Sequence, residues 1–221
     1  MLGLFDSGTG GLNTVRYIKK NAKSIDLCYL LDRGRAPYGI KSEKELIRIT
    51  DENIKRLRDM GAERVLIACC TASTVHRLLP SDSAEISLPI ISEISKRARN
   101  STRLGRIGVI ATNHTVDTHV FKSELEGFEV YEHALPQLVT MIDAGLSDTD
   151  ISEKDTEKIQ TMLEPVLNKR IDTLILGCTH FPAVIKTVEA IAKPYGVKHV
   201  IDSAKAGAEL LIKESRKLKR K

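Results

Sequence analysis

The chain has 221 residues, of which 42% are hydrophobic and 29% are charged, and this composition indicates a soluble globular protein with a sizeable core. Its net charge is +5, much of it in residues 213–221, which we expect to form a solvated, frayed C-terminus; only 4% of residues are aromatic and none is Trp, so stacking on nucleic-acid bases is poorly supported. The four cysteines lack Cys-x-x-Cys spacing and favour neither a zinc site nor a disulfide framework. The sequence shows no signal peptide and no apolar run of ~20 residues, so we expect a cytoplasmic protein with no membrane partner.

Short apolar runs alternate with amphipathic segments along the chain. We expect strands at residues 3–5, 27–31, 65–68, 90–91, 106–110, 172–176 and 198–201. Between them we expect a helix with its apolar positions at Leu12, Val15 and Ile18, and further helices at residues 42–60, at 150–167 and from about 202 onward. Continuous apolar strands that alternate with amphipathic helices are typical of parallel sheets covered on both faces. The sequence therefore predicts an α/β fold.

A repeat divides the chain. Residues 64–71 and 173–180 both run from an apolar stretch into a small residue, a cysteine and then a hydroxyl or imidazole side chain. The two cysteines, Cys69 and Cys178, are 178 − 69 = 109 residues apart, and the strands that open each half have a similar offset. We therefore predict two pseudo-symmetric halves, residues 1–95 with 203–221 and residues 96–202, joined near 92–101. The C-terminal helix is expected to return to the first half.

Candidate site residues follow the predicted strands. Ligands of parallel sheets bind beyond the carboxyl ends of the strands, where we expect Asp6, Ser7, Cys69, Thr112 and Cys178. In this interpretation residues 112–114 of the second half are equivalent to residues 6–8 of the first half.

The two cysteines are candidates for proton transfer. Each precedes an expected helix start, which lowers the pKa of a thiol. Thr71 and Thr179 can donate hydrogen bonds to a carboxylate, and His180 can hold a proton for Cys178. A single cysteine at a strand end is more often a small buried apolar residue, but two in matched contexts favour function. Two opposed thiols suit the inversion of an α-carbon, since one can remove the proton while the other returns it on the opposite face.

Other segments are weaker candidates. The glycine-rich turn at 8–11 does not match the dinucleotide-binding pattern, because Asn13 stands where that pattern has a glycine, and the lysine of a phosphate-binding loop is also missing. We therefore expect this turn to bind a small carboxylate rather than a nucleotide. Asp32 and Asp143, like Asp6, are candidate auxiliary acids, and Arg33 and Arg35 either attract an acidic substrate or carry ordinary surface charge. Cys28 lies in an expected strand and is expected to pack in the core, and of the remaining histidines only His114 stands at a strand end.

Taken together, these segments resemble the glutamate racemases of the cofactor-independent aspartate/glutamate racemase superfamily. The matching stretches span nearly the whole chain in the order typical of that family: FDSGTGGL at 5–12, RAPYG at 35–39, ACCTAS at 68–73, LGCTHFP at 176–182 and IDS at 201–203. The resemblance implies two pseudo-symmetric α/β domains with the active site in the cleft between them, and often a homodimer. It implies interconversion of L- and D-glutamate without a cofactor or metal, with D-glutamate entering peptidoglycan, and no nucleic-acid partner.

The resemblance also assigns roles. Cys69 would be the base toward D-glutamate and Cys178 the base toward L-glutamate, and Asp6 and His180 would assist their respective cysteines. Substrate binding would fall to residues from four segments: Ser7, Pro37, Tyr38, Gly39, Cys70, Thr71, Thr112 and Thr179.

The chain departs from the family at three points. Cys70 stands where the family has an asparagine, and a thiol is a poor replacement for the donors of an amide. The family's glutamate falls near Asp143, in a stretch that matches poorly, and the chain is shorter than typical members. Three alternatives therefore stay open: a racemase for aspartate or another acidic amino acid, a binding protein that has lost catalysis, and a dithiol redox protein that uses Cys69 and Cys70.

Overall fold

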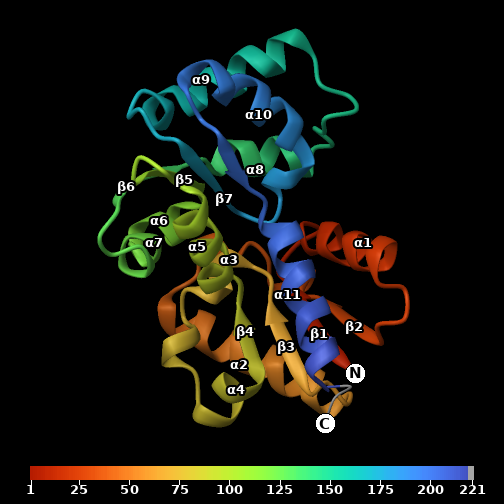
Figure 1. The fold of residues 1–221 in the computed structure, drawn as a ribbon. Helices are drawn as coiled ribbons and strands as arrows, with labels where there is room; N and C mark the ends of the chain where they lie inside the picture. The colour runs from red at the N-terminus through yellow and green to blue at the C-terminus, as the bar shows by residue number, and fades with distance from the viewer. Residues whose placement is uncertain (219–221) are drawn as a thin grey trace. The chain divides into compact units, whose positions relative to one another are not determined.

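The computed structural model describes residues 1–218, which form two compact units. Unit 1 comprises Met1–Glu93 and the C-terminal segment that begins at Ala204, and unit 2 comprises Ile94–Ser203. Each unit contains one four-stranded sheet in which every pair of neighbouring strands is parallel (Figure 1).

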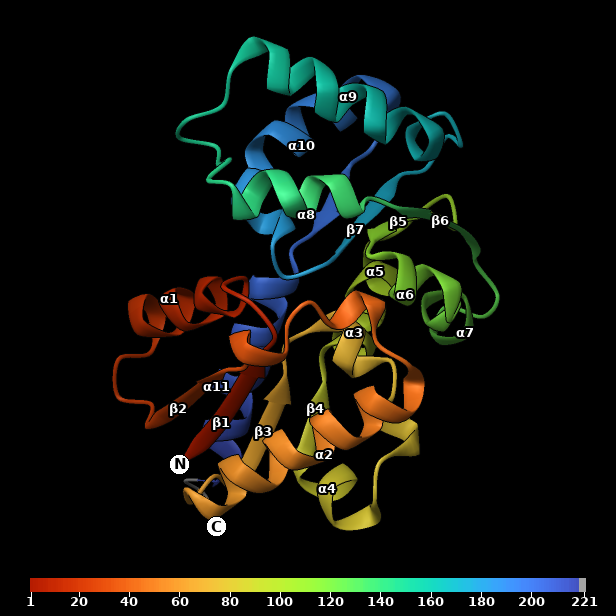
Figure 2. The same ribbon diagram turned by 180° about the vertical axis from the view of Figure 1, so that it is seen from behind.

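Unit 1 is built on the strand order β2-β1-β3-β4. Figures 1 and 2 show helices α2 and α11 on opposite faces of this sheet. The long helix α2 begins at a capping box, in which Ser42 and Glu45 exchange hydrogen bonds with each other's backbone N–H, and its apolar side is buried. The bounds are β1 Leu2–Asp6, β2 Leu27–Leu31, β3 Arg64–Ile67, β4 Ser87–Pro89, α1 Gly11–Asn21, α2 Glu43–Asp59, α3 Cys70–Ser73, α4 Ser81–Ile86 and α11 Ser203–Leu218, with the 3-10 turns η1 Arg33–Arg35, η2 Tyr38–Ile40 and η3 His76–Leu78.

Unit 2 is built on the strand order β6-β5-β7-β8. Its core lies between this sheet and helices α9 and α10, with Leu163, Leu174 and Val188 among its fully buried side chains. The bounds are β5 Arg106–Ala111, β6 Glu129–Ala134, β7 Thr173–Gly177, β8 His199–Ile201, α6 Asn113–Asp117, α7 Val120–Glu124, α8 Pro136–Asp143, α9 Glu153–Leu167 and α10 Ile185–Ala192, with η4 Phe181–Val184 and η5 Lys193–Tyr195. Helix α5, Ile90–Ser101, runs from unit 1 into unit 2.

The two sheets have the same topology, since β1 to β4 and β5 to β8 occupy the same places in their strand orders. The predicted α/β fold with two parallel sheets is therefore confirmed. The strand registers correct one detail of the repeat. Phe5 pairs with Ile67 and Ile110 pairs with Leu176, so the residue of unit 2 equivalent to Ser7 is Thr112. The expectation that 112–114 takes the place of 6–8 is wrong by one residue.

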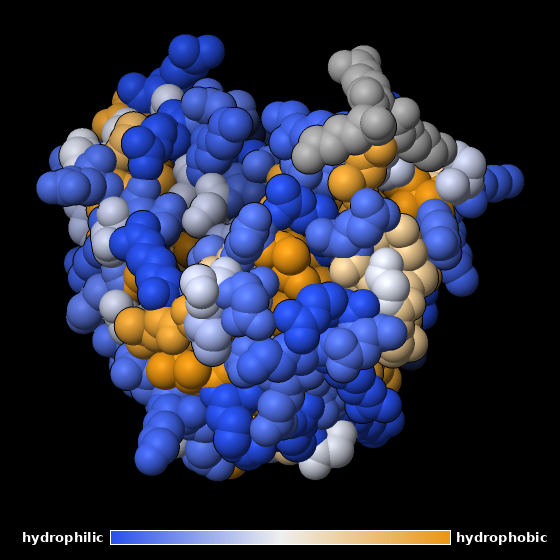
Figure 3. Space-filling model, turned by 90° about the horizontal axis from the view of Figure 1, so that it is seen from below, coloured by the Kyte–Doolittle hydropathy of each residue, from blue (hydrophilic) through white to orange (hydrophobic). Residues whose placement is uncertain are grey.

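The C-terminal helix packs on unit 1, as predicted. The Tyr17 hydroxyl donates a hydrogen bond to Glu209 Oε1 at 3.0 Å, and Gly207 lies against Leu66 of β3. Residues 213–218, expected to be frayed, belong to this helix, in which Glu214 is buried. The rest of the basic tail, 219–221, lies outside the described residues. Figure 3 shows one face of the molecule, on which hydrophilic residues surround scattered apolar ones.

One further expectation needs correction. Residues 90–91 are not a strand: they open α5, and the strand is the segment 87–89 just before them, which is too short and too polar at Ser87 to be recognised. The junction expected near 92–101 lies within α5, where unit 1 ends at Glu93 and unit 2 begins at Ile94. No helix among residues 1–218 is long and apolar enough to cross a membrane.

Candidate functional site

The candidate residues lie where the strands end, as predicted. In unit 1, β1 ends at Asp6, and Cys69 follows β3 by two residues. In unit 2, Thr112 follows β5 directly and Cys178 follows β7 directly. Each thiol is thus placed by an inner strand of its sheet.

Cys69 is buried in unit 1 beside a hydroxyl group. Its Sγ lies 3.4 Å from Ser7 Oγ, and the neighbouring Asp6 is fully buried and accepts a hydrogen bond from Gly8 N at 2.8 Å. Cys69 caps the N-terminus of the four-residue helix α3, so the expected helix start is present.

The pKa of Cys69 nevertheless moves in the direction opposite to the one expected. Burial, and then the charge of Asp6, raise the pKa of this thiol to about 11, although the Ser7 hydroxyl and the N–H groups of Ala72 and Ser7 act to lower it. The prediction of a lowered thiol pKa at Cys69 is therefore wrong. The reason is that a short helix and a few N–H groups do not offset complete burial beside a carboxylate.

A partly buried polar network holds the segment 32–38 in place. The Tyr38 hydroxyl donates a hydrogen bond to Asp32 Oδ2, and Arg35 Nε donates to the same carboxyl at 2.8 Å. Although burial acts to raise it, hydrogen bonds from Arg35, Tyr38 and Asn53 hold the pKa of Asp32 below its usual value. Burial and the bond to Asp32 raise the pKa of Tyr38. Asp32 therefore orients Tyr38. The charge of Arg35 faces two carboxylates of the protein itself, that of Asp32 and that of Glu52, whose Oε2 lies 2.6 Å from Arg35 Nη1.

Two residues of unit 1 were missed by the sequence analysis. Asn53, on α2, donates to Asp32 Oδ2 at 3.1 Å and to Tyr38 Oη at 3.0 Å, and accepts from Arg35 Nη2 at 2.6 Å. An amide side chain on the mainly apolar buried side of this helix is the signal that could have revealed it. Tyr29, on β2, donates to Gly8 O at 3.0 Å, and its pKa is raised by burial and by the charges of Asp6 and Cys69.

The thiol of unit 2 has a different neighbour. Cys178 Sγ lies 3.5 Å from His180 Nδ1, and His180 Nε2 lies 3.2 Å from Asp143 Oδ1 at the end of α8. In the tautomer that carries its proton on Nε2, facing the Asp143 carboxylate, Nδ1 can accept a proton from the thiol. The Ser203 hydroxyl also donates to the backbone oxygen of Cys178, at 3.4 Å. The expected helix start after Cys178 is a 3-10 turn, η4, and α10 begins only at Ile185.

The remaining candidates are distributed as follows. Cys70 and Thr71 open α3 and are buried, and Thr179 is buried beside Cys178. Pro37 is exposed and Gly39 is half-buried, on either side of buried Tyr38, which shares a core cluster with Cys69. Thr112 caps α6 and its hydroxyl lies 3.1 Å from that of Thr115.

Other expectations concern residues away from the strand ends. His114 lies in the first turn of α6. Cys28 lies in β2, is half-buried and packs against the core of unit 1, as expected. Within residues 1–218, no group of three or more His, Cys, Asp or Glu side chains is placed to hold a metal ion.

Known proteins resemble this chain in sequence and fold. The family of Asp/Glu/hydantoin racemases matches residues 16–211. The glutamate racemase of Persephonella marina is 38% identical over 220 residues, which is 97% of this chain and 82% of that protein. The glutamate racemase of Aquifex pyrophilus is 36% identical over 93% of this chain and 79% of that protein.

Solved structures agree. A glutamate racemase isoform of Bacillus anthracis superimposes with a TM-score of 0.82 and 29% identity, over 98% of this chain and 81% of that one. The glutamate racemase of Francisella tularensis, solved with D-glutamate, also gives a TM-score of 0.82, with 27% identity over 99% of this chain and 81% of that one. These similarities confirm the resemblance seen in the sequence: the chain belongs to the Asp/Glu/hydantoin racemase family, a family of amino-acid racemases.

Proposed function

We propose that this protein is a glutamate racemase that interconverts L- and D-glutamate with two cysteine thiols and no cofactor. The observation that carries the proposal is the placement of Cys69 and Cys178, each after the equivalent inner strand of two sheets with the same topology. In this proposal each unit supplies one of the two thiols that act on glutamate. By the same resemblance, we expect a cytoplasmic homodimer that supplies D-glutamate for peptidoglycan.

The surroundings of the two thiols suit opposite protonation states. With a pKa of about 11, Cys69 is a neutral thiol at neutral pH and can donate a proton. Cys178 can transfer its proton to His180 Nδ1, 3.5 Å away, and act as a thiolate base. In the direction from L- to D-glutamate, Cys178 takes the α-proton and Cys69 returns one on the opposite face. The reverse direction exchanges these roles, with Asp6 assisting Cys69.

Substrate binding is assigned to groups near the thiols. The hydroxyls of Ser7, Thr71, Thr112 and Thr179 can donate hydrogen bonds to carboxylate oxygens, and stabilise the charge that develops on the carbanion. The segment 37–39, fixed by the Asp32 network, would close one end of the substrate site.

The first experiment is incubation with L-glutamate in heavy water without added cofactor. NMR follows the α-hydrogen and circular dichroism follows the optical activity. Deuterium incorporation together with loss of optical activity is the expected result. If neither glutamate nor aspartate exchanges its α-hydrogen, the proposal is wrong; exchange of aspartate alone would instead support the aspartate alternative.

Single-cysteine variants test the two-thiol mechanism. We expect Cys69→Ser and Cys178→Ser each to abolish racemisation, and Cys28→Ser, a matched control in β2, to keep it. The two-thiol mechanism further predicts that Cys69→Ser retains exchange with L-glutamate only, and Cys178→Ser with D-glutamate only. Near-full racemisation by either variant would exclude the mechanism.

The buried thiol of Cys70 favours one alternative, a homologue that binds an acidic amino acid but has weakened catalysis. Cys70→Asn restores the amide donors typical of the family. A large gain in turnover by this variant over a nearly inactive wild type would support the alternative, whereas an unchanged turnover would exclude it. Normal turnover by Cys70→Ser under reducing conditions would exclude an obligatory dithiol.

A further inference from the structure

The turn between β1 and α1 has few groups of its own that could fix its position. Residues 7–10 belong to neither a helix nor a strand, and Gly8 and Gly10 have no side chain. Gly10 is the N-cap of α1, so the start of this helix lacks the side-chain hydrogen bond that a serine or aspartate would supply. The same turn carries Ser7, whose hydroxyl lies 3.4 Å from Cys69 Sγ. Its position therefore depends on contacts with other elements.

Tyr29 of β2 supplies such a contact. Its hydroxyl donates a hydrogen bond to Gly8 O at 3.0 Å, while Gly8 N donates to Asp6 Oδ1 at 2.8 Å. The backbone of Gly8 is therefore held on one side by Tyr29 and on the other by the carboxylate that neighbours the thiol. The ring of Tyr29 also packs closely against Gly11, the first residue of α1, because a Cβ there would lie 3.1 Å from Tyr29 Cε2.

We propose that Tyr29 is a positioning residue, which fixes the turn 7–10 and so holds Asp6 and Ser7 beside the thiol of Cys69. The proposal rests on the proposed function, in which Cys69 exchanges a proton with the α-carbon of glutamate. Proton transfer requires hydrogen-bond distance, so a small displacement of the groups around the thiol lowers turnover.

Tyr29 acts through the turn rather than as an acid itself. Burial, and then the charges of Asp6 and Cys69, raise the pKa of Tyr29 above its usual value. A tyrosine hydroxyl normally ionises at about pH 10, so this one stays protonated throughout the neutral range and continues to donate to Gly8 O. The hydrogen bond is therefore present in both directions of the proposed reaction.

Unit 2 reaches its helix without such a turn. Thr112, the residue equivalent to Ser7, is followed directly by α6, which begins at Asn113, and the Thr112 side chain caps that helix. In unit 1 the residues 8–10 separate Ser7 from α1, which begins at Gly11. The helix cap thus fixes Thr112, whereas Ser7 lies outside its helix and needs a contact from another element.

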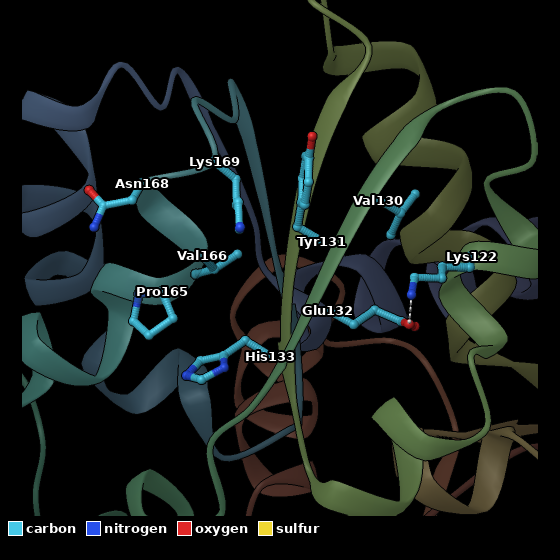
Figure 4. Close-up of a pocket in the computed structure, with 9 residues that line it drawn as sticks. All are labelled: Lys122, Val130, Tyr131, Glu132, His133, Pro165, Val166, Asn168 and Lys169. Carbon is cyan, nitrogen blue, oxygen red and sulfur yellow. Dashed lines mark ion pairs between the residues drawn. The ribbon is translucent and has the colours of Figure 1, made fainter.

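The sheet position of Tyr29 is also used differently in unit 2. Leu4 pairs with Tyr29, and its equivalent, Val109, pairs with Glu132. The side chain of Glu132 is directed to α7, where its Oε2 lies 3.5 Å from Lys122 Nζ (Figure 4). The same strand position therefore holds a turn beside the thiol in unit 1 and a helix in unit 2. We expect loss of the Tyr29 hydroxyl to affect the thiol of unit 1 alone.

Tyr29→Phe, made in the full chain, removes the hydroxyl and keeps the ring that packs against Gly11. The matched control is Tyr17→Phe. Tyr17 is half-buried like Tyr29 and also donates one hydrogen bond of 3.0 Å, in its case to Glu209 Oε1 of α11. Circular dichroism should show that both variants are folded, and urea unfolding should show similar losses of stability. A difference between them at the thiols then reports the position of the turn.

The first readout is the titration of the thiols, which requires no turnover. NMR of protein with isotope-labelled cysteine follows each thiol separately as the pH is raised. Asp6 raises the pKa of Cys69 more than the Ser7 hydroxyl lowers it, so a loosened turn in Tyr29→Phe should lower this pKa from about 11 to about 10. The control variant should keep the wild-type value, and the signals of Cys178 should be unchanged in both variants.

The second readout is the kcat for L-glutamate, which should fall about 5–10-fold in Tyr29→Phe and less than about twofold in the control. A folded Tyr29→Phe protein that keeps either the wild-type kcat or the wild-type pKa of Cys69 would overturn the proposal, and Tyr29 would then serve the fold alone. A wild type that does not racemise glutamate would instead refute the proposed function. In that case the titration of Cys69 still decides whether Tyr29 positions the turn.

Discussion

Replacing Asn53 by leucine tests whether the network around Asp32 fixes unit 1. The variant loses three hydrogen bonds at a buried position: one to the carboxylate of Asp32, one from the guanidinium of Arg35 and one to the hydroxyl of Tyr38. A bond to a charged group contributes about 1.5–3 kcal/mol and a neutral one about 0.5–1.5 kcal/mol. Because the side chain of Arg35 is 30% exposed, its bond is discounted, and we expect a loss of about 3 kcal/mol in the free energy of unfolding.

Thr50→Val is the matched control on the same helix. Thr50 is fully buried on the same side of α2 as Asn53, and its hydroxyl has no hydrogen-bond partner. Removing that hydroxyl should change the free energy of unfolding by less than about 1 kcal/mol, or raise it.

Urea unfolding of both variants, followed by circular dichroism, measures the difference. If the units unfold separately, the transition of unit 1 should shift and that of unit 2 should not. A loss no larger for Asn53→Leu than for Thr50→Val would refute the reasoning. Since Tyr38 is a proposed substrate ligand, the KM for glutamate should also rise in Asn53→Leu and stay unchanged in Thr50→Val.

Three further predictions concern the two thiols. Because the pKa of Cys69 is raised from 9.0 to about 11, its contribution to stability is present below pH 9 and is lost as the pH rises to 11. Over that range the free energy of unfolding of the wild type, measured in urea, should fall by up to about 2.7 kcal/mol relative to that of Cys69→Ala. The same pH dependence in both proteins would contradict this prediction. A Cβ at Gly11 would lie 2.7 Å from Asp6 Cβ and 3.0 Å from Tyr29 Oη, so Gly11→Ala should lower the free energy of unfolding by about 1–3 kcal/mol and lower turnover. A Cβ at Gly34 would meet nothing within 4 Å, so Gly34→Ala should change neither quantity. Asp143→Asn should lower kcat several-fold by weakening the hold on His180, an effect limited by the 55% exposure of Asp143. Asp150→Asn, on an exposed loop, should leave kcat unchanged.

The sequence was sufficient to predict the strands that place the site. Four of them, β1, β3, β5 and β7, are buried on both faces, so each is a continuous apolar run that is easily recognised. The edge strand β6 was missed because its sequence, EVYEHA, mixes charged and apolar residues, as suits a strand with one open side.

The surroundings of the site residues could not be predicted in the same way. The hydrogen bond between Asn53 and Asp32 joins residues 21 positions apart in the chain. The contact between His180 and Asp143 joins the residue before η4 to the last residue of α8. The raised pKa of Cys69 depends on burial and on the approach of Asp6, 63 residues away in the chain, while the sequence shows only the local helix start. Local patterns indicate what each residue can do, but tertiary packing decides which effect prevails.

The strand registers also show where the two halves diverge. With Ser7 equivalent to Thr112, the residue equivalent to Asp6 is Ala111, so the carboxylate beside the thiol exists in unit 1 alone. Counting from the two cysteines, His180 takes the place of Thr71, so the imidazole exists in unit 2 alone. The repeat therefore conserves the position of the thiol and changes its neighbour. A carboxylate disfavours the thiolate and a neutral imidazole can accept its proton, so two copies of one fold hold two thiols with opposite tendencies. An α-carbon that is to be inverted needs one of each, and this difference is the physical reason why the halves of the proposed active site are not interchangeable.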